Sequence, residues 1–428
     1  MPLHRRTRED TELNDIPNDL PVILNNEKPG VTMSKGRNYK ITLTDCYLAF
    51  ITQAITANLA PLLFLRFHTE FGISLGKIAL IPIAFFITQL TVDLICAGFI
   101  NKIGYRTGAL ISEALAGLGL AGLSFLPYLL PDPFTGILAS TILYAIGSGL
   151  IEVLASPIVE ACPFDNKASV MSILHSFYCW GCVGVIALSS GFFFVFGIDH
   201  WRWLPCVWSL IPFVNIINFA VCPIESLTED GVEMGMGKLF RTPVFFLGIV
   251  LMVCAGACEL AMAQWFSAFA ESAIGMPKTT GDLVGPCLFA VAMGISKVIY
   301  GKFGEKLELT KYMLGSGILC LGCYLAASLS KAPAVCLIGC IVCGFSVGIM
   351  WPGTISILSK RLPRGGTAMF AFLAMAGDLG GAMGPGIVGL IAQMNGDDLK
   401  KGMLIGSVFP LVLIISVAGI MIKVRKER

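Results

Sequence analysis

The chain has 428 residues, of which 55% are hydrophobic and 14% are charged, and it carries a formal net charge of +2. A soluble protein would have roughly 25% charged residues, whereas the apolar residues here form runs that reach the ~20 needed to cross a bilayer as a helix. The composition predicts an all-α integral membrane protein embedded in a lipid bilayer. It argues against a soluble protein and against nucleic acid as a partner.

The first 40 residues are polar and rich in charge. Arg5, Arg6 and Arg8 are followed by Glu9 and Asp10, and no apolar signal-peptide core precedes the first span. We expect residues 1–40 to form a flexible tail in the cytoplasm. Binding of a partner by this tail is the alternative interpretation.

Twelve apolar segments follow, six on each side of a polar connection. The predicted spans cover about 41–66, 77–100, 107–130, 134–161, 169–195, 203–222, 243–270, 282–300, 311–329, 333–358, 367–393 and 402–422. We expect a first six-helix half at 41–222, a cytoplasmic linker at 223–242, a second half at 243–422 and a cytoplasmic tail at 423–428.

Lysine and arginine are concentrated in alternate loops. The richer set of loops contains Lys102, Arg106, Lys167, Lys238, Arg241, Lys302, Lys306, Lys311, Lys360, Arg361 and Arg364. The intervening loops contain fewer, namely Arg66, Lys77, Arg202, Lys278, Lys331, Lys400 and Lys401. Because positive residues favour the cytoplasmic side, we expect a multi-pass protein of the cell membrane with both termini in the cytoplasm.

The two halves contain corresponding helices. Gly149-Leu-Ile-Glu152-Val-Leu-Ala-Ser156-Pro157 in the fourth span matches Gly344-Phe-Ser-Val347-Gly-Ile-Met-Trp351-Pro352 in the tenth, with Glu152 opposite Val347. Residues 93–101 align with residues 297–305 at a constant offset. Parallel repeats of this kind are typical of secondary transporters, and a carboxylate in only one copy makes Glu152 a candidate functional residue.

One loop carries a family resemblance. Ala97-Gly-Phe-Ile-Asn101-Lys102-Ile-Gly104-Tyr105-Arg106 resembles the signature loop after the second span of major facilitator superfamily transporters, with Asn101 where that family usually has Asp. Gly301-Lys-Phe-Gly-Glu305-Lys306 is a weaker copy after the eighth span. The resemblance implies the major facilitator fold, with twelve transmembrane helices in two pseudo-symmetric six-helix halves. It also implies that spans one, four, seven and ten line a central cavity.

Several stretches resemble the fucose/galactose/glucose:proton symporter group more narrowly. They are 147–152, 255–259, 297–301, 311–314 and 344–352. This resemblance implies a small-molecule solute, favouring a carbohydrate, that is moved with a proton by alternating access, without a cofactor. The fucose-type members carry an Asp late in the first span, where this chain has Asn58-Leu-Ala60-Pro61. The glucose-type members also lack that Asp, so the chain resembles them more. We expect a monomer.

Glu152 and Glu259 are the predicted proton-coupling residues. An ionisable side chain at the centre of a membrane helix costs about 2.5–3.5 kcal/mol, so each one needs a partner, water or a proton. Glu152 lies midway along the fourth span and Glu259 in the seventh. A carboxyl group in a cavity with apolar walls can exchange a proton near neutral pH. We predict that both also contact the solute; a structural role is the alternative.

Further polar and aromatic side chains are predicted to bind the solute. They are Gln53, Thr56, Asn58, Ser156, His175, Tyr178, Gln264, Trp265, Trp351 and Thr354. Trp265 can instead be an interfacial anchor, and His175 can be a packing residue. Ideal helix geometry places Glu259 and Trp265 more than about 90° apart, so they share a cavity only if the helix bends or the cavity wraps around it.

A third set is predicted to control the conformational state rather than to bind solute. It comprises Asp93, Asn101, Arg106, Glu113, Lys297, Glu305 and Asp378. Asp93 and Lys297 are repeat mates, and we expect each to pair with neighbouring helices. The residues of the signature loop and its neighbouring helix are expected to form a charge network that favours one state.

No motif indicates an enzyme, a nucleotide-binding loop or a metal site. Gly380-Gly-Ala-Met-Gly384-Pro385-Gly386 predicts a helix-packing seam, and Cys179, Cys182, Cys320 and Cys323 are interpreted as small packing residues in apolar helices. The leading hypothesis is proton-coupled symport of a sugar or other small polyol. Proton-driven export of amphipathic compounds, and a non-transporting sensor on a transporter scaffold, are the alternatives.

Overall fold

The computed structural model describes residues 38–427 except 226, 228–232, 275–277 and 397. The expected tail at 1–40 therefore lies almost wholly outside the described residues, as does much of the acidic part of the expected linker. The chain from Asn38 onward forms one compact unit. Within the described part it is helical throughout, with no strand.

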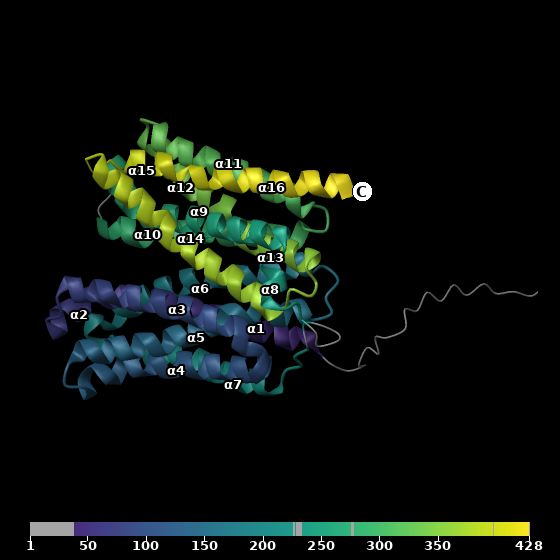
Figure 1. Cartoon of the computed structure of the whole chain (residues 1–428). Coiled ribbons are helices and arrows are strands. Elements are labelled where there is room, and N and C mark those ends of the chain that lie inside the picture. The colour runs from purple at the N-terminus through teal and green to yellow at the C-terminus, as the bar shows by residue number, and fades with distance from the viewer. Residues whose placement is uncertain (1–37, 226, 228–232, 275–277, 397, 428) are drawn as a thin grey trace, which may run out of the picture. The chain divides into compact units, whose positions relative to one another are not determined.

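The first half runs from α1 to α7. Its elements are α1 (Tyr39–Asn58), η1 (Ala60–Leu63), α2 (Phe64–Phe71), α3 (Leu75–Ile103), α4 (Tyr105–Leu129), α5 (Pro133–Ala161), α6 (Lys167–Phe196), η2 (Ile198–His200) and α7 (Trp203–Val221). In Figure 1 these purple to teal helices lie side by side as one bundle.

The second half follows a short linker helix. The remaining elements are α8 (Met236–Leu239), α9 (Pro243–Ile274), α10 (Lys278–Phe303), α11 (Leu309–Leu329), α12 (Pro333–Val347), α13 (Met350–Arg361), α14 (Gly366–Met394), α15 (Leu399–Gly406) and α16 (Val408–Glu427). The chain therefore stays helical to Glu427, where the sequence predicted a short tail.

Eleven helical segments of the described residues are long and apolar enough to cross a membrane. They coincide with eleven of the twelve predicted spans. The eighth predicted span is present as the helix α10, whose first residues have side chains outside the described part of the chain. The prediction of a multi-pass helical membrane protein is thus confirmed.

Three spans predicted as continuous helices are interrupted. The first breaks after Asn58, the tenth at Gly348 and the twelfth after Gly406. A proline follows each break, namely Pro61, Pro352 and Pro410. A proline has no N–H to donate to the carbonyl oxygen four residues before it, and its ring crowds that carbonyl group. Each break lies within about one residue of the carbonyl group affected in this way. The tenth span resumes as α13 at Met350, and Trp351 is the second residue of that helix.

Small residues allow the helices of each half to approach closely. A Cβ on Gly147 of α5 would lie 2.5 Å from the Ser112 carbonyl oxygen of α4, and a Cβ on Gly384 of α14 would lie 2.5 Å from the Ala257 carbonyl oxygen of α9. Both distances are shorter than real contacts allow, so only glycine fits. The predicted packing seam at Gly380–Gly386 is confirmed by this contact with α9.

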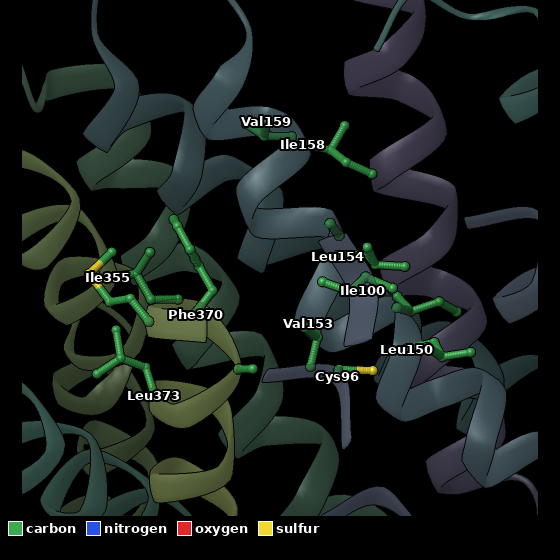
Figure 2. Packing of buried hydrophobic residues seen from close by; sticks show 14 of the residues in the cluster. Cys96, Ile100, Leu150, Val153, Leu154, Ile158, Val159, Ile355, Phe370 and Leu373 are labelled. Atoms are coloured by element: carbon green, nitrogen blue, oxygen red, sulfur yellow. The ribbon is translucent and has the colours of Figure 1, made fainter. Parts of the chain in front are cut away.

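The two halves share a buried apolar cluster on one side of the bundle. We call this side the linker side, because α7 ends there, α8 lies there and α9 begins there. The linker-side core joins α3 and α5 of the first half to α13 and α14 of the second. Figure 2 shows part of it, with Cys96, Ile100, Leu150, Val153, Leu154, Ile158 and Val159 on one flank and Ile355, Phe370 and Leu373 on the other.

On the opposite side, which we call the far side, the main cores belong to one half each. Ile55, Leu120 and Val185 represent a cluster made almost wholly from the first half. The second half has its own large cluster, and a small contact of Ala54 and Cys182 with Ala290 joins the halves near the middle. Because burial of apolar surface is what holds the halves together, the structure is closed on the linker side.

Hydrogen bonds reinforce this closure. Tyr105 Oη at the start of α4 and Thr367 Oγ1 at the start of α14 lie 2.6 Å apart and share a hydrogen bond between the halves. Glu233 of the linker accepts from the backbone N–H of Thr367 at 3.2 Å, and Met234 N–H donates to the Arg364 carbonyl oxygen at 2.6 Å. The linker is therefore fastened to the second half beside the point where the halves meet.

Candidate functional site

A cavity of about 120 Å³ lies between the halves, at the level where the linker-side core ends. This volume holds several water molecules or one small solute. The cavity receives side chains from α1, α3, α5, α6, α9, α10, α13 and α14. The lining residues are Phe50, Gln53, Ala57, Phe86, Gln89, Ser148, Glu152, His175, Tyr178, Gly256, Glu259, Leu260, Lys297, Trp351, Gly377 and Asp378.

Glu152 is the most closely coordinated carboxylate of the cavity. Gln53 Nε2 of α1 donates to Glu152 Oε2 at 2.9 Å, and Gln89 Nε2 of α3 donates to the same oxygen. Among the described residues no lysine or arginine lies within ion-pair distance of Glu152. Three helices of the first half therefore place one carboxyl group against two neutral amides and leave its charge uncompensated.

Glu259 and Lys297 bring charges of opposite sign from the second half. Both line the cavity and interact electrostatically, although the described residues contain no ion pair of 4 Å or less between them. Lys297 Nζ donates to the His175 carbonyl oxygen at 3.4 Å and lies 3.3 Å from Cys179 Sγ. The ammonium group is 3% exposed and is thus held at the contact between α10 and α6.

Aromatic side chains form part of the cavity wall. Trp351 lines the cavity directly after the break between α12 and α13, and a Cβ on Gly377 of α14 would collide with its indole ring. His175 lies with its ring centroid 4.8 Å from that of Phe50, while its Nε2 lies 3.2 Å from Ser156 Oγ. The imidazole is therefore both packed and hydrogen-bonded at the cavity margin.

Carboxyl groups outnumber cations around the cavity. The carboxyl groups of Glu152, Glu259 and Asp378 line the cavity together with the lysine Lys297. Asp93 lies within electrostatic range of Glu152 and Asp378. Buried oxygen atoms without a hydrogen-bond partner among the described residues include Gln53 Oε1 and Ser148 Oγ. Within the same part of the chain, no His, Cys, Asp and Glu side chains are grouped to hold a metal ion.

Six of the residues predicted to bind solute line the cavity. They are Gln53, Glu152, His175, Tyr178, Glu259 and Trp351. Lys297 and Asp378, predicted to control conformation, also line it. They share the cavity wall with Glu259 and Trp351, and their control of the conformational state stays a prediction.

The other six predicted solute residues lie outside the cavity lining. Thr56 and Thr354 are buried, and their hydroxyls donate to carbonyl oxygens of their own helices, at 2.8 Å to Gln53 and 2.7 Å to Met350. This is the usual satisfaction of a threonine in an apolar helix. Ser156 contacts His175 from behind the cavity wall. In this conformation none of these three hydroxyls faces the cavity.

Asn58, Gln264 and Trp265 lie toward the far side. Asn58 Nδ2 donates to the Ala54 carbonyl oxygen at 2.9 Å and contacts Cys182 Sγ at 3.2 Å. Gln264 is exposed. Trp265 Nε1 donates to the Pro385 carbonyl oxygen at 3.0 Å, which fixes the indole against α14. For Trp265 the geometry agrees with the helix-rotation argument that separated it from Glu259.

The residues of the signature loop take different positions. Arg106 caps the C-terminal end of α7 by donating to the carbonyl oxygens of Phe219, Ala220 and Cys222 at 2.6–2.8 Å. This is the favourable place for a cation on a helix dipole. Glu305 is exposed after α10, and the Asn101 side chain lies outside the described part of the chain. Among the described residues, Arg106 and Glu305 form no ion pair, and the part of the expected charge network that involves Asn101 lies outside the described side chains.

Glu113 is held inside the first half. Thr52 Oγ1 of α1 and Asn215 Nδ2 of α7 donate to its two oxygens at 3.1 and 2.8 Å. Glu113 is fully buried, and its described hydrogen bonds are to helices of its own half. The expectation that it joins Arg106 in one network is therefore wrong for this conformation, since Arg106 is committed to the end of α7.

Gln89 and Ser148 line the cavity but are absent from the residues predicted from the sequence. Each precedes a recognised carboxylate by four residues, Asp93 and Glu152, and therefore shares its helix face. That spacing was a usable signal. Phe50, Phe86 and Leu260 carried no comparable signal, because an apolar residue facing a cavity looks the same as one facing lipid.

Two repeated helical halves around a central polar cavity define a membrane transport protein. The sequence profile of the Major Facilitator Superfamily matches residues 46–385, and the chain belongs to this family. It is therefore a transporter by family, and family members are not enzymes. The recognition of this superfamily from the loop at 97–106 is confirmed.

Solved structures share the fold. A crystal structure of the major facilitator transporter FucP in the outward conformation matches with a TM-score of 0.76 and 15% identity, covering 89% of this chain and 99% of that one. A second FucP structure, of the E. coli fucose:proton symporter, gives 0.75 and 15% over the same shares. The proton:xylose symporter XylE bound to 6-bromo-6-deoxy-D-glucose gives 0.74 and 12%, covering 89% and 94%. A comparison with curated protein sequences yields no match.

Proposed function

We propose that the protein is a proton-coupled symporter of a small polar solute, with a sugar as the favoured class. The observation that carries this proposal is Glu152, a carboxyl group between the halves that is bound by two amides and has no lysine or arginine within ion-pair distance among the described residues. The solute would bind in the cavity, and the two halves would rock about it. The sugar:proton symporters among the structural neighbours support the proposal through their fold alone.

The cavity chemistry suits a hydroxylated ring. Sugar hydroxyls need both donors and acceptors, which Gln53, Gln89 and Glu152 supply from the first half. Trp351 offers an aromatic surface for the apolar face of the ring. The unpartnered oxygens of Gln53 and Ser148 are further acceptors for solute hydroxyls. A solute of this kind would donate hydrogen bonds to these two oxygens.

Glu152 is suited to gain and lose a proton without losing its partners. A glutamine presents an NH₂ group to a carboxylate and a carbonyl oxygen to the O–H of a carboxylic acid. Gln53 and Gln89 can therefore serve either form by rotating their amides. Glu259 differs, because Lys297 lies in electrostatic range and favours its ionised form. We assign the exchanging proton to Glu152 and a solute-orienting role to the Glu259–Lys297 pair.

The side of entry follows from the charge distribution of the loops. The richer set of lysine and arginine residues lies on the linker side, which we propose to be cytoplasmic. Both termini would then be cytoplasmic. On this assignment the linker-side core closes the cavity to the cytoplasm, and an external solute would reach the cavity from the far side.

Export of amphipathic compounds by proton antiport is the second candidate. It is favoured by the apolar part of the cavity wall, which includes Phe50, Phe86 and Leu260 beside Trp351. Such a wall adapts to apolar solutes of varied shape. The polar groups of the first half argue against it, because an apolar solute would leave Glu152 and its amides unsatisfied.

Transport by purified protein in proteoliposomes separates the two candidates. Labelled hexoses, 6-deoxyhexoses, pentoses and polyols are offered with and without an imposed pH gradient, alkaline inside. We expect at least one sugar to accumulate above equilibrium only with the gradient, and sugar addition to alkalinise the external medium. Absence of accumulation for the whole panel, together with gradient-driven extrusion of a hydrophobic cation, would overturn the proposal in favour of export.

A further inference from the structure

Asp93 is a buried carboxyl group that the proposed function does not use. It is 0% exposed, and both of its carboxyl oxygens are without a hydrogen-bond partner among the described residues. Glu113, another fully buried carboxyl group of the first half, has two donors. An ionised carboxylate with no donor and no cation in an apolar site is strongly unfavourable. The contrast indicates that Asp93 is neutral in this conformation.

Asp93 lies at the boundary between the cavity and the linker-side core. On the cavity side, one helical turn away, is Gln89; on the other side, Cys96 and Ala97 belong to the linker-side core. α3 packs against α14 of the second half. Asp378 occupies the same boundary on α14, since it lines the cavity while Ala376 is part of the linker-side core. The two carboxyl groups thus come from opposite halves, on two helices that pack together, and lie in electrostatic range of each other.

Asp378 also has an oxygen without a donor. Its Oδ2 is buried and, among the described residues, has no hydrogen-bond partner. The charged groups in electrostatic range of Asp93 are Glu152 from α5 and Asp378 from α14, with the Cys96 thiol on α3 itself. α2 and α4 adjoin α3 near its ends and bring no charged group to Asp93. All of its charged neighbours are therefore acidic, and a like charge in range disfavours the ionised form of Asp93 further.

From this juxtaposition we infer that Asp93 carries a proton when the linker side is closed, at a site distinct from Glu152, and that the negative charge of Asp378 from the opposite half favours this proton. Binding adds the proton to one carboxylate oxygen of Asp93 and removes its negative charge, so no further reactant is needed. When α3 and α14 separate on the linker side, water reaches Asp93 and the proton leaves to that side. Protonation of this site therefore stabilises closure, and loss of the proton favours opening.

The inference needs the chain to alternate between closed and open states, as transporters of its family do. It does not depend on the solute being a sugar or on Glu152 carrying the coupled proton. A measurement of opening without solute and without a pH gradient can therefore fail or succeed independently of the proposed function. Hydrogen exchange of the full-length protein in lipid nanodiscs is such a measurement.

The readout is backbone exchange at the linker-side ends of α3, at 92–103, and α14, at 366–376. Wild type and variants are compared at equal pD, so that the intrinsic exchange rate cancels. In wild type, opening is expected to rise from mildly acidic to mildly alkaline pD by up to about tenfold per unit if one proton is released. Asp93→Asn, which mimics the protonated acid, should stay protected throughout. Asp378→Asn removes a negative charge that opposes ionisation of Asp93, so it should shift the pD dependence to lower pD.

Glu113→Gln is the matched control, because it neutralises an equally buried carboxyl group that faces only its own half. It should keep the wild-type pD dependence. Wild-type pD dependence in both Asp93→Asn and Asp378→Asn would overturn the inference, as would equal loss of the dependence in Glu113→Gln. Protection that responds to sodium in place of choline at constant pD would overturn the assignment to a proton and identify a metal cation instead.

Discussion

The two walls of the cavity use different chemistry although they come from repeated halves. The first-half wall holds one carboxyl group, Glu152, against the amides of Gln53 and Gln89. The second-half wall holds Glu259 with Lys297 in electrostatic range, beside the indole of Trp351. Neutral partners allow a carboxyl group to change its protonation state, whereas a cation favours the ionised form. On the proposed function, the duplication preserved the helical framework and separated proton exchange, on the first-half wall, from solute orientation, on the second-half wall.

Glu152→Gln is the strongest way to break this comparison. The variant keeps the shape and hydrogen-bonding capacity of the protonated acid but cannot release a proton. We expect accumulation driven by a pH gradient to be abolished, while exchange of labelled for unlabelled solute across proteoliposomes persists. Glu113→Gln serves as the control and should accumulate solute like wild type. Full gradient-driven accumulation by Glu152→Gln would remove Glu152 from coupling.

Lys297→Met tests the second-half wall. It leaves the Glu259 carboxylate without its cation in a buried site, so solute affinity should fall by on the order of tenfold or more. Adding Glu259→Gln should restore part of the loss, with an interaction energy of about 1–3 kcal/mol in the double-mutant cycle. Binding is measured by isothermal titration calorimetry of the two single variants and the double variant. Additive losses would show that the two charges act independently.

Trp351→Ala addresses the aromatic platform of the same wall. Loss of the indole surface should weaken solute binding by about 1–2 kcal/mol, or roughly 5- to 30-fold, while Trp351→Phe keeps most of the affinity. Trp265→Ala is the matched control, because the Trp265 indole donates to Pro385 outside the cavity. An affinity loss for Trp265→Ala as large as that for Trp351→Ala would return Trp265 to the solute site.

Tyr105→Phe has the smallest expected effect. It removes the hydrogen bond between Tyr105 Oη and Thr367 Oγ1 that joins the halves on the linker side. A net loss of about 0.5–1.5 kcal/mol should shift the balance toward linker-side opening by roughly two- to tenfold, seen as faster hydrogen exchange at the start of α14. Tyr39→Phe also loses a tyrosine hydroxyl that contacts the linker, at Glu225. Because that bond joins α1 to the segment after α7 and not to the second half, exchange at α14 should stay unchanged.

The sequence located part of the site through chemistry that is rare in membranes. Glu152, Glu259, Asp378 and Lys297 stood out because ionisable residues in apolar helices are costly, and all four line the cavity. The prediction of hydroxyl residues that bind the solute agreed less well with the cavity lining. Thr56 and Thr354 look the same in sequence as cavity residues, but their hydroxyls are satisfied by their own helices.

Rotation of the helices about their axes explains the difference. In a soluble helix a polar face shows which side is exposed, whereas in a membrane bundle the lipid-facing and protein-facing sides are both apolar. The breaks at Gly348 and after Asn58 add a change of direction that no periodicity reveals. Trp351 reaches the cavity after such a break, while Trp265 on the longer helix α9 is turned toward Pro385.

By itself the sequence determined that the chain is a helical membrane protein, where its spans lie, that its halves repeat and which family it belongs to. These follow because a bilayer requires about 20 apolar residues per helix and satisfies the backbone only within the helix. Only the tertiary structure decided that Gln53 and Gln89 meet at Glu152, that Lys297 faces the cavity and that Asp93 lies in electrostatic range of Asp378 from the opposite half. Those pairings depend on helix rotation and on which side of the bundle is closed, and both are set by packing between segments far apart in the chain.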